Sequence, residues 1–339
     1  MTVKEVFDLR KQGRIEEAYE AIRPMYAVHQ GKYTTLCMFW TASDILKKRI
    51  MELKEQREQS SACTNSAESR MKKTEGQQRL DEAEKIFKAL LRVLPNIEDK
   101  DGRALSSILY EAVTLDKEIK DFSMLDFVSQ LKVDRLSDED WKTITAPAVD
   151  GTPSHPIPSV AQQLLTCVFH EIQEDATVDN ALKAMPLLQE AMRRNPRNKN
   201  CQRYMAVVYR IMGEKEKAID IYQQLLKHNR DSYLYAELAE LTEDPGKKAA
   251  LFCQAIQNQR QEKFRTGYRM ELARLLIDRD KPKAVYELQK CIVTRKEQGF
   301  GVTKEMQQML QQLTGAQPVT DAEQQAFYKK MVEKYTNNM

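Results

Sequence analysis

The C-terminal half of the chain alternates apolar and polar positions with the period of an α-helix. Residues 199–230 show the pattern best, with small, aromatic and apolar side chains on both sides of a glycine: Ala206, Tyr209, Gly213, Ala218, Tyr222 and Leu225. Spacings of three and four residues place such side chains on one helix face. Glycine suits the turn between two helices, because a left-handed backbone there meets no Cβ. The segment therefore predicts a helix hairpin whose second helix covers residues 216–227.

This hairpin pattern recurs along the chain. Small residues at the expected helix crossings return roughly every 34 residues, which is typical of stacked helical hairpins: Ala184, Ala218, Ala249 and Ala284. A larger side chain at a crossing would push the two helix axes apart. Further helices are predicted at 160–174, 180–195 and 232–241, another copy of the hairpin at 262–293, and a capping hairpin at 303–313 and 321–335. Pro186 is expected to kink the helix at 180–195.

The small–aromatic–Gly–Ala–aromatic pattern of residues 199–230 resembles the tetratricopeptide repeat (TPR) family. The resemblance implies an all-α fold, an α-solenoid of stacked antiparallel helix hairpins that winds into a superhelix with a concave inner face. It also implies that the first helix of each repeat lines that face. The family's usual role is protein binding, so the resemblance points to a binding scaffold.

The N-terminal half fits the repeat less well, so we expect an irregular helical region there. Leu9, Gly13, Ala18, Ile22 and Met25 fit one repeat, and residues 81–95 fit the second helix of another. The distance between them is too long for adjacent copies. The excess is assigned to an insertion near 57–76, which reads either as a loop or as an extension of two long helices.

A proline-rich stretch divides the two halves. Four prolines and a glycine lie between residues 146 and 158, and such residues interrupt regular structure. Just before it, Ser137 and Asp140 have the spacing of a capping box, which predicts a short helix. We therefore expect an irregular TPR-like region at 1–143, a linker at 144–158, and a regular TPR array with capping helices at 159–339.

Composition narrows the function classes. The net charge of +3 across 339 residues is a weak bias, whereas nucleic-acid binders usually carry a strong basic excess. No stretch approaches the roughly 20 apolar residues of a membrane span. The six cysteines lie far apart without a C-x-x-C pair, which favours small apolar core residues in a reducing cytoplasm. A cytoplasmic protein with no membrane contact is the resulting prediction.

Motifs for catalysis, cofactors or metals are not apparent. His170-Glu171-Ile172-Gln173-Glu174 comes near the zinc-protease pattern, but its last position is Glu, so only one imidazole is offered. Phosphate-binding and dinucleotide-binding glycine motifs are also missing. The sequence therefore predicts a protein that is not an enzyme and uses no cofactor and no metal.

Register with the TPR family places eight side chains on the concave face. Four arginines among them flank apolar and aromatic residues. The groove would consist of Arg203, Val207, Arg210, Tyr235, Leu238, Arg265, Arg269 and Ala273. A guanidinium group binds carboxylate through two parallel hydrogen bonds. The groove is therefore expected to hold a partner protein or peptide, with an acidic segment as one candidate.

Three alternatives stay open at this point. The arginines are equally well explained as ordinary surface charges. Basic clusters at 193–199 and 259–265, close to Tyr204 and Phe264, suit an RNA-binding helical repeat. The third alternative is a ligand-regulated effector whose two halves hinge at the proline-rich stretch.

Overall fold

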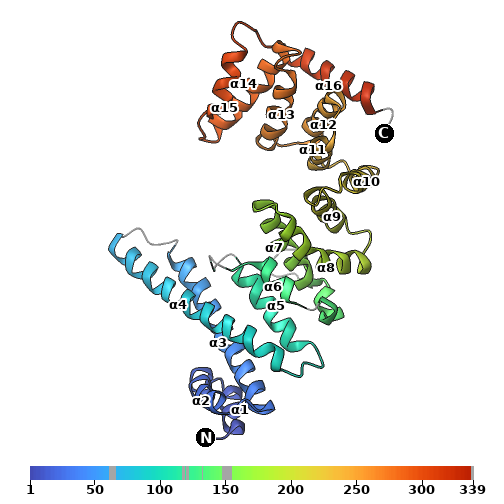
Figure 1. Cartoon of the computed structure of the whole chain (residues 1–339). Helices are drawn as coiled ribbons and strands as arrows, with labels where there is room; N and C mark the ends of the chain where they lie inside the picture. Colours follow the sequence, from blue (N-terminus) through green and yellow to red (C-terminus); the bar gives the residue numbers. More distant parts are fainter. Residues whose placement is uncertain (61–65, 117–118, 120–121, 132, 147–154, 337–339) are drawn as a thin grey trace. The chain divides into compact units, whose positions relative to one another are not determined.

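The computed structural model describes the whole chain except residues 61–65, 117–118, 120–121, 132, 147–154 and 337–339. Within the described residues the chain folds into sixteen α-helices, four short 3₁₀ helices and one two-stranded sheet (Figure 1). This confirms the all-α class. The chain divides into two compact units, Met1–Glu190 and Ala191–Met339, which are described separately.

The first unit begins with helices packed in chain order. α1 (Val3–Lys11) packs on α2 (Ile15–Val28), α2 packs on α3 (Lys32–Ser60), and α3 packs along α4 (Ser66–Val93). The long α3 and α4 lie side by side in Figure 1. The insertion predicted near 57–76 is thus an extension of two long helices over its described backbone, and residues 61–65 lie outside the described part.

Shorter elements complete the first unit. They are η1 (Leu94–Asn96), α5 (Arg103–Leu115), α6 (Met124–Gln130), η2 (Val133–Arg135), η3 (Asp138–Trp141), β1 (Ile144–Ala146), β2 (His155–Ile157), α7 (Val160–Glu174) and most of α8 (Val178–Arg194). The capping box at Ser137 and Asp140 is present and begins η3. Pro186 lies inside α8, which is one continuous helix from 178 to 194.

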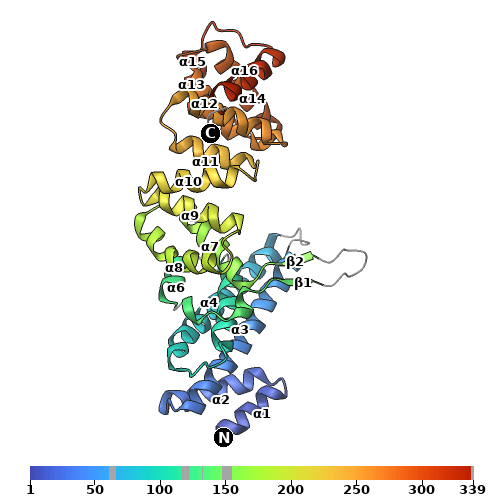
Figure 2. The same cartoon turned by 90° about the vertical axis from the view of Figure 1, so that its right-hand side faces the viewer.

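The proline-rich stretch lies inside the first unit. Its two described ends pair as antiparallel strands, with Ile144 opposite Ile157 (Figure 2). α7 follows directly and packs on both α5 and α6. Glu171 of α7 also binds the start of α6, because its Oε2 accepts hydrogen bonds from Ser123 Oγ at 3.0 Å and Leu125 N at 3.1 Å. The compact units consequently divide at Glu190, later than the predicted linker, and residues 147–154 of that linker lie outside the described part.

The second unit is a stack of helix hairpins. Each helix packs on the next through α9 (Lys199–Ile211), α10 (Lys215–Leu226), α11 (Ser232–Leu241), α12 (Pro245–Asn258), α13 (Thr266–Leu276) and α14 (Lys281–Glu297). Gly213 turns between α9 and α10 with φ of 80°, as its position in the repeat predicts. Ala206, Ala218, Ala249 and Ala284 are buried together in one core. The small residues of the repeat therefore lie at close helix contacts.

The end of the second unit differs from the predicted capping hairpin. η4 (Glu262–Phe264) precedes α13, and α15 (Lys304–Gln312) packs on α14. α16 (Asp321–Thr336) instead packs along α12. Gly246 near the start of α12 permits this approach, since an added Cβ would lie 2.3 Å from Tyr335 Oη of α16. The last helix therefore covers an earlier hairpin, and its buried Gln324 and Tyr328 contact Glu287 of α14.

Candidate functional site

Arg203 is held by a carboxylate of the next hairpin. Its Nε lies 3.0 Å from Oε1 and 3.1 Å from Oε2 of Glu237, so α9 and α11 are joined by a guanidinium–carboxylate pair. The guanidinium also stacks over the ring of Tyr233, 4.4 Å from its centroid. Such pairing uses the planar donor fork that would otherwise bind a ligand carboxylate.

Arg210 and Arg265 are paired in similar ways. Arg210 of α9 forms an ion pair with Glu240 of α11. Arg265 donates from Nε to the carbonyl oxygen of Gln259 at 2.7 Å and from Nη1 to Glu262 at 2.8 Å. Both side chains keep some exposure to solvent. Arg210 and Arg265 both stabilise contacts within the second unit. Partner binding at either arginine stays a prediction.

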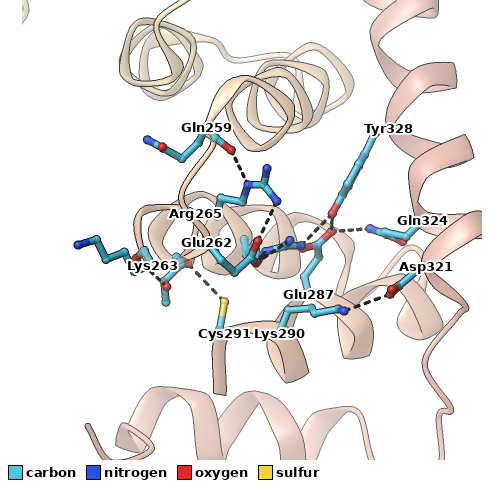
Figure 3. A network of polar contacts seen from close by, with 12 residues as sticks. Gln259, Glu262, Lys263, Arg265, Glu287, Lys290, Cys291, Asp321, Gln324 and Tyr328 are labelled. Carbon is cyan, nitrogen blue, oxygen red and sulfur yellow. Dashed lines mark hydrogen bonds and ion pairs between the residues drawn. The ribbon is translucent and has the colours of Figure 1, made fainter. Parts of the chain in front are cut away.

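Arg269 belongs to a buried polar network. Its guanidinium contacts Glu262 Oε1 at 2.8 Å, Glu287 Oε2 at 2.7 Å and Tyr328 Oη at 3.1 Å. Gln324 of α16 donates to the other oxygen of Glu287 at 2.5 Å. Figure 3 shows Tyr328 and Gln324 reaching from α16 toward Glu287. The network joins α13, α14 and α16.

Burial governs the charges of this network. It raises the pKa of Glu287, and the nearby Arg269 opposes that rise. Burial, the largest single effect, lowers the pKa of the Arg269 guanidinium, but Glu287, Tyr328 and Glu262 together outweigh it, so that pKa is raised. Arg269 is only 4% exposed. It therefore has a structural role here and does not present its guanidinium on a groove surface as expected.

Three apolar residues of the predicted groove lie in the core. Val207 and Ala273 are buried, which differs from the expectation that they face a ligand. Helix packing explains this difference, because α9 packs against α10, and α13 packs against α12 and α14. Leu238 is also buried, but it forms part of the wall of a pocket, together with Tyr235.

This pocket lies among α10, α11 and α12 and has a volume of about 350 Å³. Apolar side chains make most of its wall: Leu226, Tyr235, Leu238 and Leu251. The amides of Gln223 and Gln254 and the ammonium of Lys227 add polar groups to the same lining. An apolar pocket with a few polar groups is the usual form of a binding site. Two of the eight predicted groove residues, Tyr235 and Leu238, thus line the same pocket.

In the described part of the chain, no group of three or more His, Cys, Asp or Glu side chains is placed to hold a metal ion. Among the same described residues, no helix has the length and apolar character needed to cross a membrane. Glu171, the acidic residue of the near-protease motif, binds the start of α6 as described above.

Comparisons with known proteins leave the function open. A family described as a domain of unknown function (DUF7017) matches residues 201–334, which hold all eight predicted groove residues and the pocket. No curated protein matches the chain in sequence. Among solved structures, the chain is similar to a tetratricopeptide repeat protein from Parabacteroides merdae, with 13% identity and a TM-score of 0.39. That match covers 92% of this chain and 97% of the other.

Proposed function

We propose that the chain is a non-enzymatic protein-interaction scaffold, and that the pocket among α10, α11 and α12 anchors an apolar side chain of a partner peptide. The observation that carries the proposal is the apolar wall of Leu226, Tyr235, Leu238 and Leu251 beside polar groups. Binding energy in protein interfaces concentrates where a few side chains fill desolvated pockets. A volume of about 350 Å³ suits one large side chain of a partner better than a cofactor.

The polar groups of the pocket indicate the chemistry of the partner that fits it. Gln223 and Gln254 each carry a donor and an acceptor, which suits the backbone of an extended or helical peptide. Lys227 supplies a positive charge at the same lining. A partner with a large apolar residue and an acidic residue nearby fits this arrangement. The expected acidic character of the partner thus rests on Lys227, since the four arginines are paired within the second unit.

The reducing cytoplasm expected from the sequence belongs to the same proposal. Five cysteines, Cys37, Cys167, Cys201, Cys253 and Cys291, are buried free thiols in the described chain. Burial raises the pKa of the Cys201 thiol to about 11, so its reactive thiolate is disfavoured at neutral pH.

Site-specific photo-crosslinking tests the pocket. A photoreactive residue replaces Gln223 at the pocket or, as the matched control, the exposed Gln289 of α14, and both proteins are irradiated in native cell extract. We expect one partner to crosslink from position 223 and not from 289, and Tyr235→Ala and Lys227→Glu to weaken its capture at least fivefold. Lys304→Glu, a charge reversal on α15, should leave capture unchanged.

Two results would count against the proposal. Equal crosslinking from both positions would remove the pocket as the binding site. Capture that depends on RNA, and that weakens steeply between low and physiological salt, would favour the nucleic-acid alternative.

A further inference from the structure

A second and larger pocket lies in the first unit, about 820 Å³ in volume, with walls from α3, α5 and η3. Two aromatic side chains, Trp40 and Tyr110, line it. Tyr110 is 59% exposed, so part of its ring is accessible to a ligand. The ring of Trp40 already carries a guanidinium, since Arg10 lies 5.7 Å from its centroid. The pocket therefore offers aromatic surface of the kind that attracts cations.

The hydroxyl groups of the pocket offer acceptors. Ser106 Oγ donates its proton to the carbonyl oxygen of Gly102 at 2.9 Å. Ser137 Oγ donates to Asp140 at 2.8 Å, and Ser107 Oγ donates to Glu111 at 3.2 Å. Ser137 Oγ also accepts from Asp140 N at 3.3 Å, and Ser107 Oγ lies 3.0 Å from Ser43 Oγ. Because a hydroxyl has one proton and two lone pairs, each of the three serines still has a lone pair and has no free proton. The pocket wall can therefore accept more hydrogen bonds than it can donate.

Glu111 lies behind this wall. Lys47 and Ser107 both line the pocket and both contact the Glu111 carboxylate. Its Oε1 accepts from Ser43 Oγ at 2.6 Å and from Ser107. Its Oε2 is buried and has no hydrogen-bond partner among the described residues. A buried carboxylate oxygen without a hydrogen-bond partner is rare in proteins. This oxygen can accept a hydrogen bond from a ligand.

Charge alone does not select the ligand of this pocket. Asp101 and Glu139 line it together with Lys47 and Arg103, so the formal charges balance. Lys47 Nζ lies 3.9 Å from Glu111 Oε1, too far for a hydrogen bond, and its side chain is 46% exposed. An incoming donor can displace an exposed lysine, whereas Glu111 is fixed by two serines. The choice of ligand therefore depends on the hydrogen-bonding groups of the pocket wall, which favour a ligand that donates hydrogen bonds.

We propose that this pocket binds the guanidinium group of an arginine side chain in a partner protein, against Tyr110 and with Glu111 as the buried counter-charge. A guanidinium has five N–H donors in a planar fork and no acceptor. That inventory complements free serine lone pairs, two surface carboxylates and one unpaired buried oxygen. The site lies in the first unit and takes a basic ligand, so it is separate from the apolar anchor proposed above.

The experiment uses the full chain and a small probe. The probe is the acetylated, amidated peptide Gly-Gly-Arg-Gly-Gly, and its control carries citrulline, which is neutral and of the same shape. Binding is followed by the NMR signal of the Trp40 indole, assigned with Trp40→Phe. We expect the arginine peptide to bind with a Kd on the order of 1 mM, and the citrulline peptide at least fivefold more weakly.

Substitutions at the pocket test whether it binds a guanidinium group. Glu111→Gln should weaken binding at least fivefold, and Tyr110→Ala about threefold. Lys47→Ala should leave the affinity equal or make it tighter, since it removes a like charge. A weaker arginine-peptide affinity in Lys47→Ala would show that Lys47 supports the bound peptide instead of repelling it, and would overturn the proposal. Unchanged binding in Glu111→Gln would also overturn it, because the free oxygen would then serve an ordered water only.

The affinity should also follow pH. Burial raises the pKa of Glu111 to about 7, although Ser43, Lys47 and Ser107 oppose the rise and Asp44 adds to it. A cation binds the ionised carboxylate, so affinity should increase up to about tenfold between pH 6 and pH 8. Should Glu111→Gln fail to fold, Asp101→Asn with Glu139→Gln replaces it, with at least threefold weaker binding expected. An arginine-peptide affinity that is constant across this pH range would contradict the role of Glu111.

Discussion

Arg269 of α13 and Glu287 of α14 form an ion pair of 2.7 Å inside the second unit, with 5% and 0% of their side chains exposed. Removing one member of a buried pair leaves the other charge without compensation and costs about 3–5 kcal/mol. We expect Arg269→Ala to lower the free energy of unfolding of this unit by that amount. Urea unfolding with hydrogen exchange of α13, α14 and α16 measures it.

A double substitution is the control for that loss. Arg269→Met together with Glu287→Leu removes both charges, and apolar replacements of similar volume are often neutral or stabilising. We expect the double variant to recover most of the stability lost in Arg269→Ala. If Arg269→Ala is as stable as the unmodified chain and loses only partner capture, Arg269 belongs to a binding surface instead.

The pair Arg203 and Glu237 is less buried and should matter less. Both side chains keep partial exposure, 20% and 15%, so solvent screens part of their attraction. We expect Arg203→Ala to cost about 1–2 kcal/mol, chiefly through lost hydrogen bonds to a charged group. A double-mutant cycle with Glu237→Ala isolates the coupling. A coupling energy near zero would show that Arg203 is free to bind a ligand carboxylate.

Helix hairpins could be predicted from this sequence, whereas the pairing of their charged residues could not. The period and the small residues around Ala206 and Ala218 indicate local structure, because they depend on residues close in sequence. Arg203 pairs with Glu237 across 34 residues, and Tyr328 meets Arg269 across 59. Such contacts depend on how hairpins stack and on the path of α16. From sequence alone, the same four arginines fit either a binding groove or ordinary surface charges, and their internal pairing was not predicted.

The pocket among α10, α11 and α12 could likewise be predicted only in part from the sequence. Tyr235 and Leu238 were predicted from the repeat register, and both line it. Gln223 and Leu226 come from α10, and Leu251 and Gln254 come from α12. These helices are the second helices of their hairpins, which the family register places away from the concave face. Only the packing of α11 between α10 and α12 brings the residues to one hollow.

Gly246 and Tyr335 set how closely α16 approaches α12. A Cβ at position 246 would meet Tyr335 Oη at 2.3 Å and Cζ at 2.4 Å, so the tyrosine ring must move. We expect Gly246→Ala to cost about 0.5–1.5 kcal/mol, the range for an off-rotamer side chain. Hydrogen exchange should become faster in the last turns of α16. Adding Tyr335→Ala should remove the clash, and persistent fast exchange in that double variant would place the effect elsewhere.

Glu111 should make the stability of the first unit depend on pH. Its pKa is raised to about 7 in the folded chain from an ordinary value of 4.5, with burial as the main cause. The folded state therefore holds a proton that the unfolded chain releases between these values, and stability falls as pH rises from about 4.5 to 7. The full difference is at most about 3 kcal/mol.

Glu111→Gln should remove this dependence. Glutamine keeps an acceptor for Ser43 and carries no charge, so the variant should be more stable than the unmodified chain at pH 8 and similar at pH 4.5. Thermal unfolding at both pH values measures this, with Glu139→Gln at the same pocket as the control for an exposed carboxylate. If Glu111 lowers the stability of the first unit and also strengthens arginine-peptide binding, its role is in binding and not in stability. Equal pH profiles for Glu111→Gln and the unmodified chain would show that Glu111 is ionised at no cost.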